Sequence, residues 1–204
     1  MSDKDMEITE QTTKKEKPNM VLSLLDFFEI VVFSITVVIL IFSFVMRLCV
    51  VNGGSMNPTL INGERLLVSD LFYKPECGDI IVFHQTGEYD NEPMVKRVIA
   101  VGGETVDIDF DTKSDTCTVT ITDKNGYSRI LDEPYAQFIE PIRSAQGNQT
   151  YPLYVPDGYV FVMGDNRYNS KDSRDLSVGL VDERRILGKA ILRVAPFDKF
   201  GTID

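Results

Sequence analysis

The chain begins with a polar segment and then becomes strongly apolar. Residues 1–20 mix acidic and basic side chains without a repeating apolar pattern, which predicts a disordered tail. Residues 30–46 form a run of 17 residues without a charged side chain. A membrane-spanning helix needs about 20 apolar residues, so the span must draw on flanking residues, with Glu29 and Arg47 near the two interfaces. The pattern predicts a transmembrane helix within residues 21–51, with a buried helix of a soluble protein as the alternative.

The charges beside the apolar run predict its orientation. Lys14, Lys15 and Lys17 precede the run, whereas Arg47 stands alone at its other end. Cytoplasmic flanks are enriched in basic residues, so we expect a cytoplasmic N-terminus and an extracytoplasmic region at residues 52–204. No cleavage site of the A-x-A type follows the run, which favours an uncleaved, single-pass signal anchor.

Residues 52–204 show short apolar runs separated by Gly, Pro, Asn and Asp. This pattern is typical of β-strands, and the runs are RLLVSDLF, GDIIVFH, MVKRVIAV, TCTVTITD, GYVFVMGD and GKAILRV. The pair Asn125-Gly126 between two such runs predicts a hairpin turn. Residues 132–158 contain four prolines and predict a long irregular connection. The predicted fold class is therefore mainly β, with one transmembrane helix in front of a single β-rich domain.

Composition narrows the classes of function. A net charge of -10 offers no basic surface to a phosphate backbone, so nucleic acid is not an expected partner. Cys49, Cys77 and Cys117 show no CxxC spacing, and His84 is the only histidine in the chain, so we expect no metal and no cofactor. A disulfide between Cys77 and Cys117 stays open as an alternative to free thiols.

Ser55 lies in the stretch GGSMNPTL, residues 53–60, shortly after the apolar run. Gly53 and Gly54 allow a sharp turn and a close approach of another chain, and Pro58 stiffens the exit from the turn. Such a loop is suited to presenting a nucleophilic hydroxyl, although the same composition is also found in ordinary turns. A serine nucleophile requires a base that removes its proton.

Two residues compete for the role of base. His84 would be the base of a Ser-His-Asp triad, but it ends an apolar run, where a surface histidine is the simpler interpretation. Lys96 in PMVKRVIAV would share a strand face with Met94 and Val98. Apolar surroundings lower the pKa of a lysine, as a general base requires. The alternative is a lysine at the edge of a sheet that points into water.

The segment GDNRYNSKDSR, residues 164–174, carries a polar side chain at nearly every position after an apolar run. It lacks the mid-loop glycine and the terminal glutamate of a calcium-binding EF-hand loop. A solvated loop is the simple interpretation. Beside an active site, Ser170 would hydrogen-bond an amine, and Asp172 would pair with Arg174 or Arg167 to fix the loop.

Together these segments resemble type I signal peptidases of the compact Gram-positive type, which are membrane-anchored Ser-Lys peptidases. The resemblance covers most of residues 27–194, with GGSMNPTL, GDIIVF, KRVIAVGGE, GDNRYNSKDSR and GKAILRV in the family's order. It implies Ser55 as nucleophile and Lys96 as general base. It further implies supporting roles for Ser170, which would hydrogen-bond the lysine, for the pair Asp172 and Arg174, and for Asp165 in holding its loop.

The resemblance also implies a substrate and a location. The substrates would be preproteins bearing signal peptides, cut after small residues in A-x-A sites, at the outer side of the plasma membrane. The signal peptide would bind as an added strand between two backbone segments, formed by Val50, Val51 and Asn52 on one side and Pro93, Met94 and Val95 on the other. Membrane lipid and the secretion translocon are the further expected partners.

Two departures from the family pattern affect the site. Some members carry a serine two positions before the nucleophile, whose hydroxyl helps to stabilise the oxyanion, but this chain has Gly53 there. Oxyanion stabilisation would then rest on the Ser55 N-H and other backbone donors. The stretch between Lys96 and Asp165 is short, so a large accessory β-domain is expected to be absent or reduced.

Two other functions compete with signal peptide removal. A non-catalytic relative would use the same groove to hold or assemble a surface protein, but such a protein is expected to have lost Ser55 or Lys96. A soluble, self-cleaving repressor would share the Ser-Lys chemistry, but the predicted membrane span and the absence of a DNA-binding segment argue against it.

Overall fold

The computed structural model describes residues 20–84, 93–111, 116–136 and 147–203. The chain forms two compact units, residues 1–42 and 43–204. The tail predicted for residues 1–20 lies outside the described residues except for Met20, and the connection predicted for residues 132–158 lies partly outside them.

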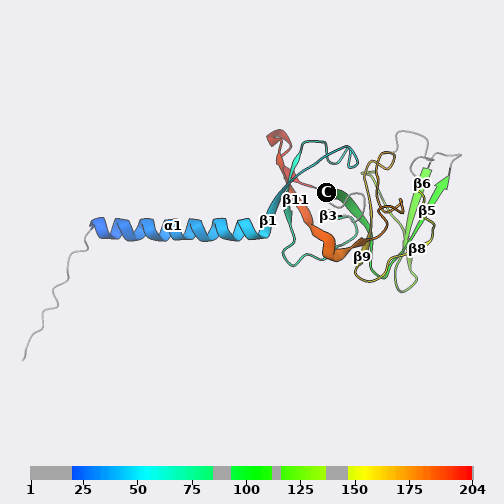
Figure 1. The fold of residues 1–204 in the computed structure, drawn as a ribbon, viewed down its shortest axis with the longest axis horizontal. Coiled ribbons are helices and arrows are strands. Elements are labelled where there is room, and N and C mark those ends of the chain that lie inside the picture. Colours follow the sequence, from blue (N-terminus) through cyan, green and yellow to red (C-terminus); the bar gives the residue numbers. More distant parts are fainter. Residues whose placement is uncertain (1–19, 85–92, 112–115, 137–146, 204) are drawn as a thin grey trace, which may run out of the picture. The chain divides into compact units, whose positions relative to one another are not determined.

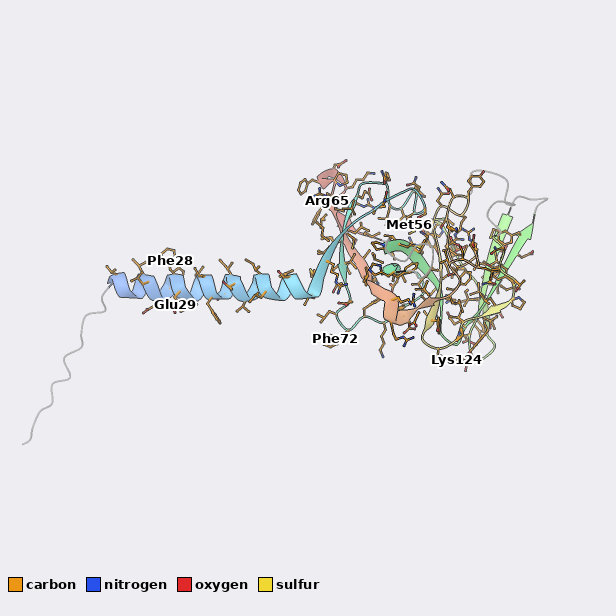
Figure 2. All side chains as sticks on the ribbon, viewed as in Figure 1. Phe28, Glu29, Met56, Arg65, Phe72 and Lys124 are labelled. Carbon is orange, nitrogen blue, oxygen red and sulfur yellow. The ribbon has the colours of Figure 1, made fainter. Side chains whose placement is uncertain are left out.

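Helix α1, Met20–Val45, follows from an apolar run that contains neither glycine nor proline. Most of its described apolar side chains are exposed, and Figure 2 labels one of them, Phe28. The hydroxyls of Ser34 and Thr36 bond back to carbonyl oxygens one turn earlier, at 2.7 and 2.8 Å. Within the part of the chain that the structure describes, no helix meets the length and hydropathy needed to cross a membrane. The membrane span stays a prediction.

The helix ends before the predicted end of the span at residue 51. Residues Met46–Val50 form strand β1, which pairs with β2, Arg65–Ser69, in antiparallel register. Cys49 packs against the domain core whereas its neighbours Leu48 and Val50 are exposed, as expected for the two opposite faces of a strand. The β-domain therefore begins inside the segment that the sequence assigned to the helix.

Eight strands form the larger sheet, in the order β1-β2-β11-β3-β4-β9-β10, with β12 beside β11. The pairs β1–β2, β2–β11, β11–β3, β3–β4 and β4–β9 are antiparallel. The remaining strands are β3 Ile80–His84, β4 Pro93–Val101, β9 Tyr159–Met163, β10 Val181–Asp182, β11 Ile186–Ala195 and β12 Gly201–Thr202. Two short 3-10 helices, Glu183–Arg185 and Phe197–Lys199, flank β11.

A second sheet has the order β7-β6-β5-β8. Its strands are β5 Thr105–Asp111, β6 Thr116–Thr122, β7 Ser128–Ile130 and β8 Leu153–Tyr154, and Figure 1 shows β5, β6 and β8 beyond β9. The predicted hairpin turn is confirmed between β6 and β7, where Gly126 has φ 82° and its N-H donates to Asp123 O at 2.9 Å. The prediction of a mainly β fold with one helix is thus confirmed.

The apolar core anchors the two segments that carry the candidate dyad. Neighbouring residues of β4 point to opposite faces, so Val98 and Ile99 enter different core clusters. Met56 and Leu60 flank the Ser55 loop, are almost fully buried and pack in a third cluster with residues of β2, β3 and β11. Figure 2 labels Met56 in the interior of this unit. Both segments are therefore held by buried side chains.

Candidate active site

Ser55 and Lys96 meet at the centre of the candidate site. Lys96 Nζ lies 2.8 Å from Ser55 Oγ, within hydrogen-bond distance, and donates to Val95 O at 3.0 Å. Ser55 lies in the loop after β1, and Lys96 lies in the first half of β4. The distance allows direct proton transfer between the hydroxyl and the amine.

Lys96 is buried, with 3% of its surface exposed. Removal from water is the main cause that lowers its pKa from an ordinary 10.5 to about 8. The positive charge of Arg174 acts in the same direction, while the carboxylates of Asp172 and Asp165 favour the ammonium form. The site therefore holds a lysine that gives up its proton more readily than an ordinary lysine.

The Ser55 loop is closed upon itself by backbone hydrogen bonds. The N-H of Val51 donates to Glu64 O and the N-H of Gly63 to Val51 O, both at 2.8 Å. Gly53 has a backbone φ of 93°, which residues with a side chain rarely adopt. Its N-H donates to Asn62 Oδ1 at 2.9 Å. These contacts fix the turn that carries Ser55, the candidate nucleophile.

Asp165 joins the 164–174 loop to both β4 and the Ser55 loop. Arg97 forms a two-pronged ion pair with its carboxylate, at 2.9 Å from Nε and 2.8 Å from Nη2. Thr59 Oγ1 donates to Asp165 Oδ2 at 2.5 Å. Since Arg97 follows Lys96 on β4, one buried carboxylate holds the strand of the lysine against the loop of the serine.

Further contacts hold the same two loops together. Asn166 donates from its backbone N to Ser55 O and from Nδ2 to Gly54 O, both at 3.1 Å. Gly164 lies so close to this junction that a Cβ on it would be 2.4 Å from Ser55 O and 2.2 Å from Ser170 Oγ. Only glycine fits this approach without displacing the Ser55 loop.

Asp172 and Arg174 form the predicted pair inside the 164–174 loop. Arg174 Nε and Nη2 each lie 2.8 Å from a carboxylate oxygen of Asp172, and both residues are buried. Asp172 also accepts the N-H of Gly164 at 2.9 Å. Burial alone would raise the pKa of Asp172, but Arg174 and this N-H outweigh it and hold that pKa below its ordinary value. The carboxylate therefore stays ionised beside Lys96.

Ser170 differs from its expected role as a hydrogen-bond partner of the lysine. Its Oγ is buried close to Gly164, and its interaction is with the carboxylate of Asp172, whose pKa it helps to lower, rather than with Lys96. The amine of Lys96 is instead engaged by Ser55 and Val95. Among the described residues, the serine whose hydroxyl hydrogen-bonds Lys96 is Ser55, the candidate nucleophile.

A groove of about 750 Å³ runs past Ser55 and Lys96. Its walls contain all six residues assigned to the substrate site, namely Val50, Val51, Asn52, Pro93, Met94 and Val95, together with Met56, Asn62, Gly63 and Lys171. In the described sheet β1 pairs only with β2, and β4 pairs with β9 only from Arg97 onward. Two open strand edges therefore border the groove.

His84 lies apart from this arrangement. It is exposed at the end of β3 and stands opposite Pro93 in the strand register. Among the described residues, the hydrogen-bond partner of Ser55 Oγ is Lys96. The triad that the sequence left open has no support in this geometry.

The described residues show no metal cluster and no disulfide. They contain no group of three metal-ligating side chains. Cys77 and Cys117 are free thiols, and burial raises the pKa of Cys117 to about 11.

The sequence did not assign roles to several residues that support the site. Arg97 follows Lys96 on β4, and nothing in the sequence identifies Asp165 as its partner. Arg167 pairs with Glu133 at 2.5 Å, and the ring of Tyr135 lies 3.9 Å from the Arg97 guanidinium. These contacts join segments that are far apart in the chain, so no local sequence pattern predicts them.

A mainly β fold with a serine hydroxyl against a buried lysine, beside a groove with open strand edges, defines the class of serine peptidases. The chain belongs to the signal peptidase family, because residues 24–195 match the family model described as signal peptidase, peptidase S26. It is therefore a serine peptidase of the signal peptidase I kind, whose activity is the removal of signal peptides.

Individual relatives match over most of the chain. Signal peptidase I of Bacillus licheniformis is 33% identical over 199 residues, which cover 94% of this chain and 100% of that protein. Signal peptidase IB of Staphylococcus aureus is 33% identical over 194 residues, covering 87% of this chain and 92% of the relative. A crystal structure of a signal peptidase I from Enterococcus faecalis V583 is 32% identical and covers 57% of this chain and 97% of its own, with a TM-score of 0.41.

Proposed function

We propose that this chain removes signal peptides, with Ser55 as nucleophile and Lys96 as general base. It would cut preproteins after small residues, at the point where they emerge from the membrane. The single observation that carries the proposal is the 2.8 Å contact between Ser55 Oγ and the amine of a lysine that is 3% exposed. Burial of this amine supplies the low pKa that a lysine base requires.

In the acylation half of the reaction, neutral Lys96 takes the proton of Ser55 Oγ while the oxygen attacks the scissile carbonyl carbon. The C=O π bond opens to an oxyanion, which the Ser55 N-H is available to stabilise, since no hydrogen bond of the described residues uses it. The oxyanion then collapses, the C-N bond breaks, and Lys96 returns its proton to the leaving amine. An ester joins Ser55 to the signal peptide.

In the deacylation half, Lys96 is again neutral and takes a proton from a water molecule. The resulting hydroxide attacks the ester carbonyl, and the C-O bond to Ser55 breaks. Lys96 delivers the proton to Ser55 Oγ, which restores the free enzyme. The supporting residues Asp165, Asp172 and Arg174 maintain the geometry and touch no reacting atom in this scheme.

The groove supports a preference for small residues. A substrate strand between β1 and β4 would form backbone hydrogen bonds to both open edges. Its first and third residues before the cut would point to the same side, because strand side chains alternate. Val51, Met56, Met94 and Val95 line the groove with apolar side chains, so small residues such as Ala are expected at those two positions.

Anchoring in the plasma membrane is part of the proposal. It is supported by the uncharged run at 30–46 and by the exposed apolar side chains of α1. The N-terminus would be cytoplasmic and residues 52–204 extracytoplasmic, where they would meet preproteins that leave the translocon. Extraction of cell membranes with carbonate should leave the protein in the pellet, whereas release into the supernatant would contradict the anchor.

The test of the reaction is cleavage of a preprotein with an A-x-A site by the full chain in detergent, read by mass spectrometry. Wild type is expected to cut after the final alanine. Ser55→Ala, Lys96→Ala and Lys96→Arg should all be inactive, the last because a guanidinium stays protonated.

Two outcomes would contradict the proposal in different ways. Undiminished cleavage by Lys96→Ala would show that another group is the base. Absence of cleavage by folded wild-type protein would favour the non-catalytic function, in which the groove only holds an exported chain.

A further inference from the structure

The proposed reaction leaves one part of the site unexplained, namely the donors that stabilise the oxyanion. Catalysis of acyl transfer usually relies on preorganised N-H or O-H groups at the position where the negative charge develops. The Ser55 N-H is one such donor. Gly53 has no side chain to offer, and no atom lies within 4 Å of the position that a Cβ at residue 53 would take. The space beside the nucleophile loop is therefore open on that side.

Asn62 contacts the backbone of Gly53 from outside the space that a Cβ would occupy. Its Oδ1 accepts the N-H of Gly53 at 2.9 Å, although nine residues separate the two in the chain. Asn62 is held there because its neighbour Gly63 donates to Val51 O at 2.8 Å and thus pairs the two ends of the loop. The carboxamide of Asn62 is therefore bound to the backbone of Gly53, which lies two residues before the candidate nucleophile Ser55.

The same hydrogen bond fixes which way the carboxamide is turned. A backbone N-H can only donate, so the side-chain atom facing Gly53 is the oxygen, and Nδ2 is directed away from that bond. Asn62 is exposed and lines the groove together with Ser55 and Lys96. Among the described residues, no hydrogen bond uses its Nδ2. A fixed side-chain donor is thus available at the wall of the groove.

We propose that Asn62 Nδ2 is the second oxyanion donor of this enzyme and acts together with the Ser55 N-H. This inference rests on the proposed function, since it concerns the oxyanion formed when Ser55 attacks. The side chain of Asn62 then has two roles on its two ends: Oδ1 holds the backbone at Gly53, and Nδ2 stabilises the charge. A side-chain donor from residue 62 supplies what residue 53 lacks.

Two substitutions separate these roles. Asn62→Asp keeps an oxygen that accepts the Gly53 N-H but replaces the donor with a charged acceptor. Asn62→Ala removes both ends. Asn148→Asp is the matched control, because Asn148 is also exposed and its Oδ1 also accepts a backbone N-H, that of Leu176, at 2.7 Å.

The measurement is cleavage of an A-x-A preprotein by the full chain in detergent, with kcat and KM determined over a range of pH. Each kcat is taken from the alkaline plateau, because a carboxylate at residue 62 favours the ammonium form of Lys96 and shifts the profile. We expect both Asn62 variants to lose about 100-fold or more in kcat, the usual effect of removing one oxyanion donor, while KM changes less than about threefold. Asn148→Asp should match wild type.

Other outcomes would overturn the inference. If Asn62→Asp keeps the wild-type kcat while Asn62→Ala loses activity, Asn62 only holds Gly53. If both variants keep it, residue 62 has no role in the reaction. A rise in KM at constant kcat would make Asn62 a substrate-binding residue instead. Failure of wild type itself to cleave would reject the proposed function and this inference with it.

Discussion

Burial of Lys96 has a cost to stability that can be measured directly. Met is an unbranched side chain of similar length that cannot become charged, so Lys96→Met tests this cost in the least disruptive way. We expect the variant to be inactive and, at pH 7, more stable than wild type. This combination identifies a residue that is retained for chemistry at the expense of stability.

The magnitude follows from the pKa of Lys96, which burial lowers from 10.5 to about 8. At roughly 1.4 kcal/mol for each pH unit, the folded state disfavours the protonated lysine by about 3 kcal/mol at pH 7. Methionine avoids this penalty but loses the contacts to Ser55 Oγ and Val95 O, each worth about 1 kcal/mol. The expected net gain at pH 7 is about 1 kcal/mol.

The pH dependence of the difference does not depend on the value assigned to those contacts. Between the folded pKa of about 8 and the unfolded value near 10.5, the unfolded chain binds more protons, so wild type gains stability as the pH rises. Lys96→Met lacks this gain. Its advantage should shrink by about 2 kcal/mol between pH 7 and pH 10. With the contact values used above, the advantage then changes sign.

The assay is urea unfolding of the full chain in detergent, followed by far-UV circular dichroism for both proteins at the two pH values. Other ionisable groups contribute alike to both proteins, so the difference in unfolding free energy isolates Lys96. A difference that stays constant between pH 7 and pH 10 would refute a lowered pKa and remove the physical basis of the lysine base.

Three further predictions concern the same site. The kcat/KM of wild type should rise with pH through an apparent pKa of about 8, because the neutral form of Lys96 is active; a profile that is flat from pH 6 to 9 would contradict this. Gly164→Ala should lower kcat at least about tenfold, since its Cβ would lie 2.4 Å from the carbonyl oxygen of the nucleophile. Gly201→Ala is the control, because its added Cβ has no atom within 4 Å; it should leave kcat unchanged in the same assay. Asp165→Asn leaves Arg97 buried without its partner charge and should lower the free energy of unfolding by about 3 kcal/mol, measured by urea denaturation; a loss below about 1 kcal/mol would show that the pair is not needed.

Local patterns predicted those features that depend on neighbouring residues. The alternation around Lys96 placed it on an apolar strand face, and the structure shows it buried in β4. Asn125-Gly126 predicted a turn because its conformation depends mainly on glycine at one position. The helix boundary was missed because no turn residue separates the apolar run from strand β1, Met46–Val50.

Long-range contacts could not be predicted in the same way. Arg97 and Asp165 are 68 residues apart, and they meet only because β4 pairs with β9, which ends just before Asp165. The contact between Asn62 and Gly53 likewise depends on how the loop closes on itself. The resemblance to a family pointed to the candidate dyad and its loop, whereas the residues that hold them in place require the folded chain.

The open edges of β1 and β4 bear on how many different substrates one enzyme can serve. Hydrogen bonds between strands involve peptide groups, which every residue except proline presents in the same form. The affinity gained at these edges is therefore nearly independent of the amino-acid sequence of the bound segment. In the proposed binding mode, discrimination rests on the few side chains that face the groove wall. One enzyme of this kind would then accept leaders of unrelated sequence, and those leaders could diverge at every position that only the strand edges hold.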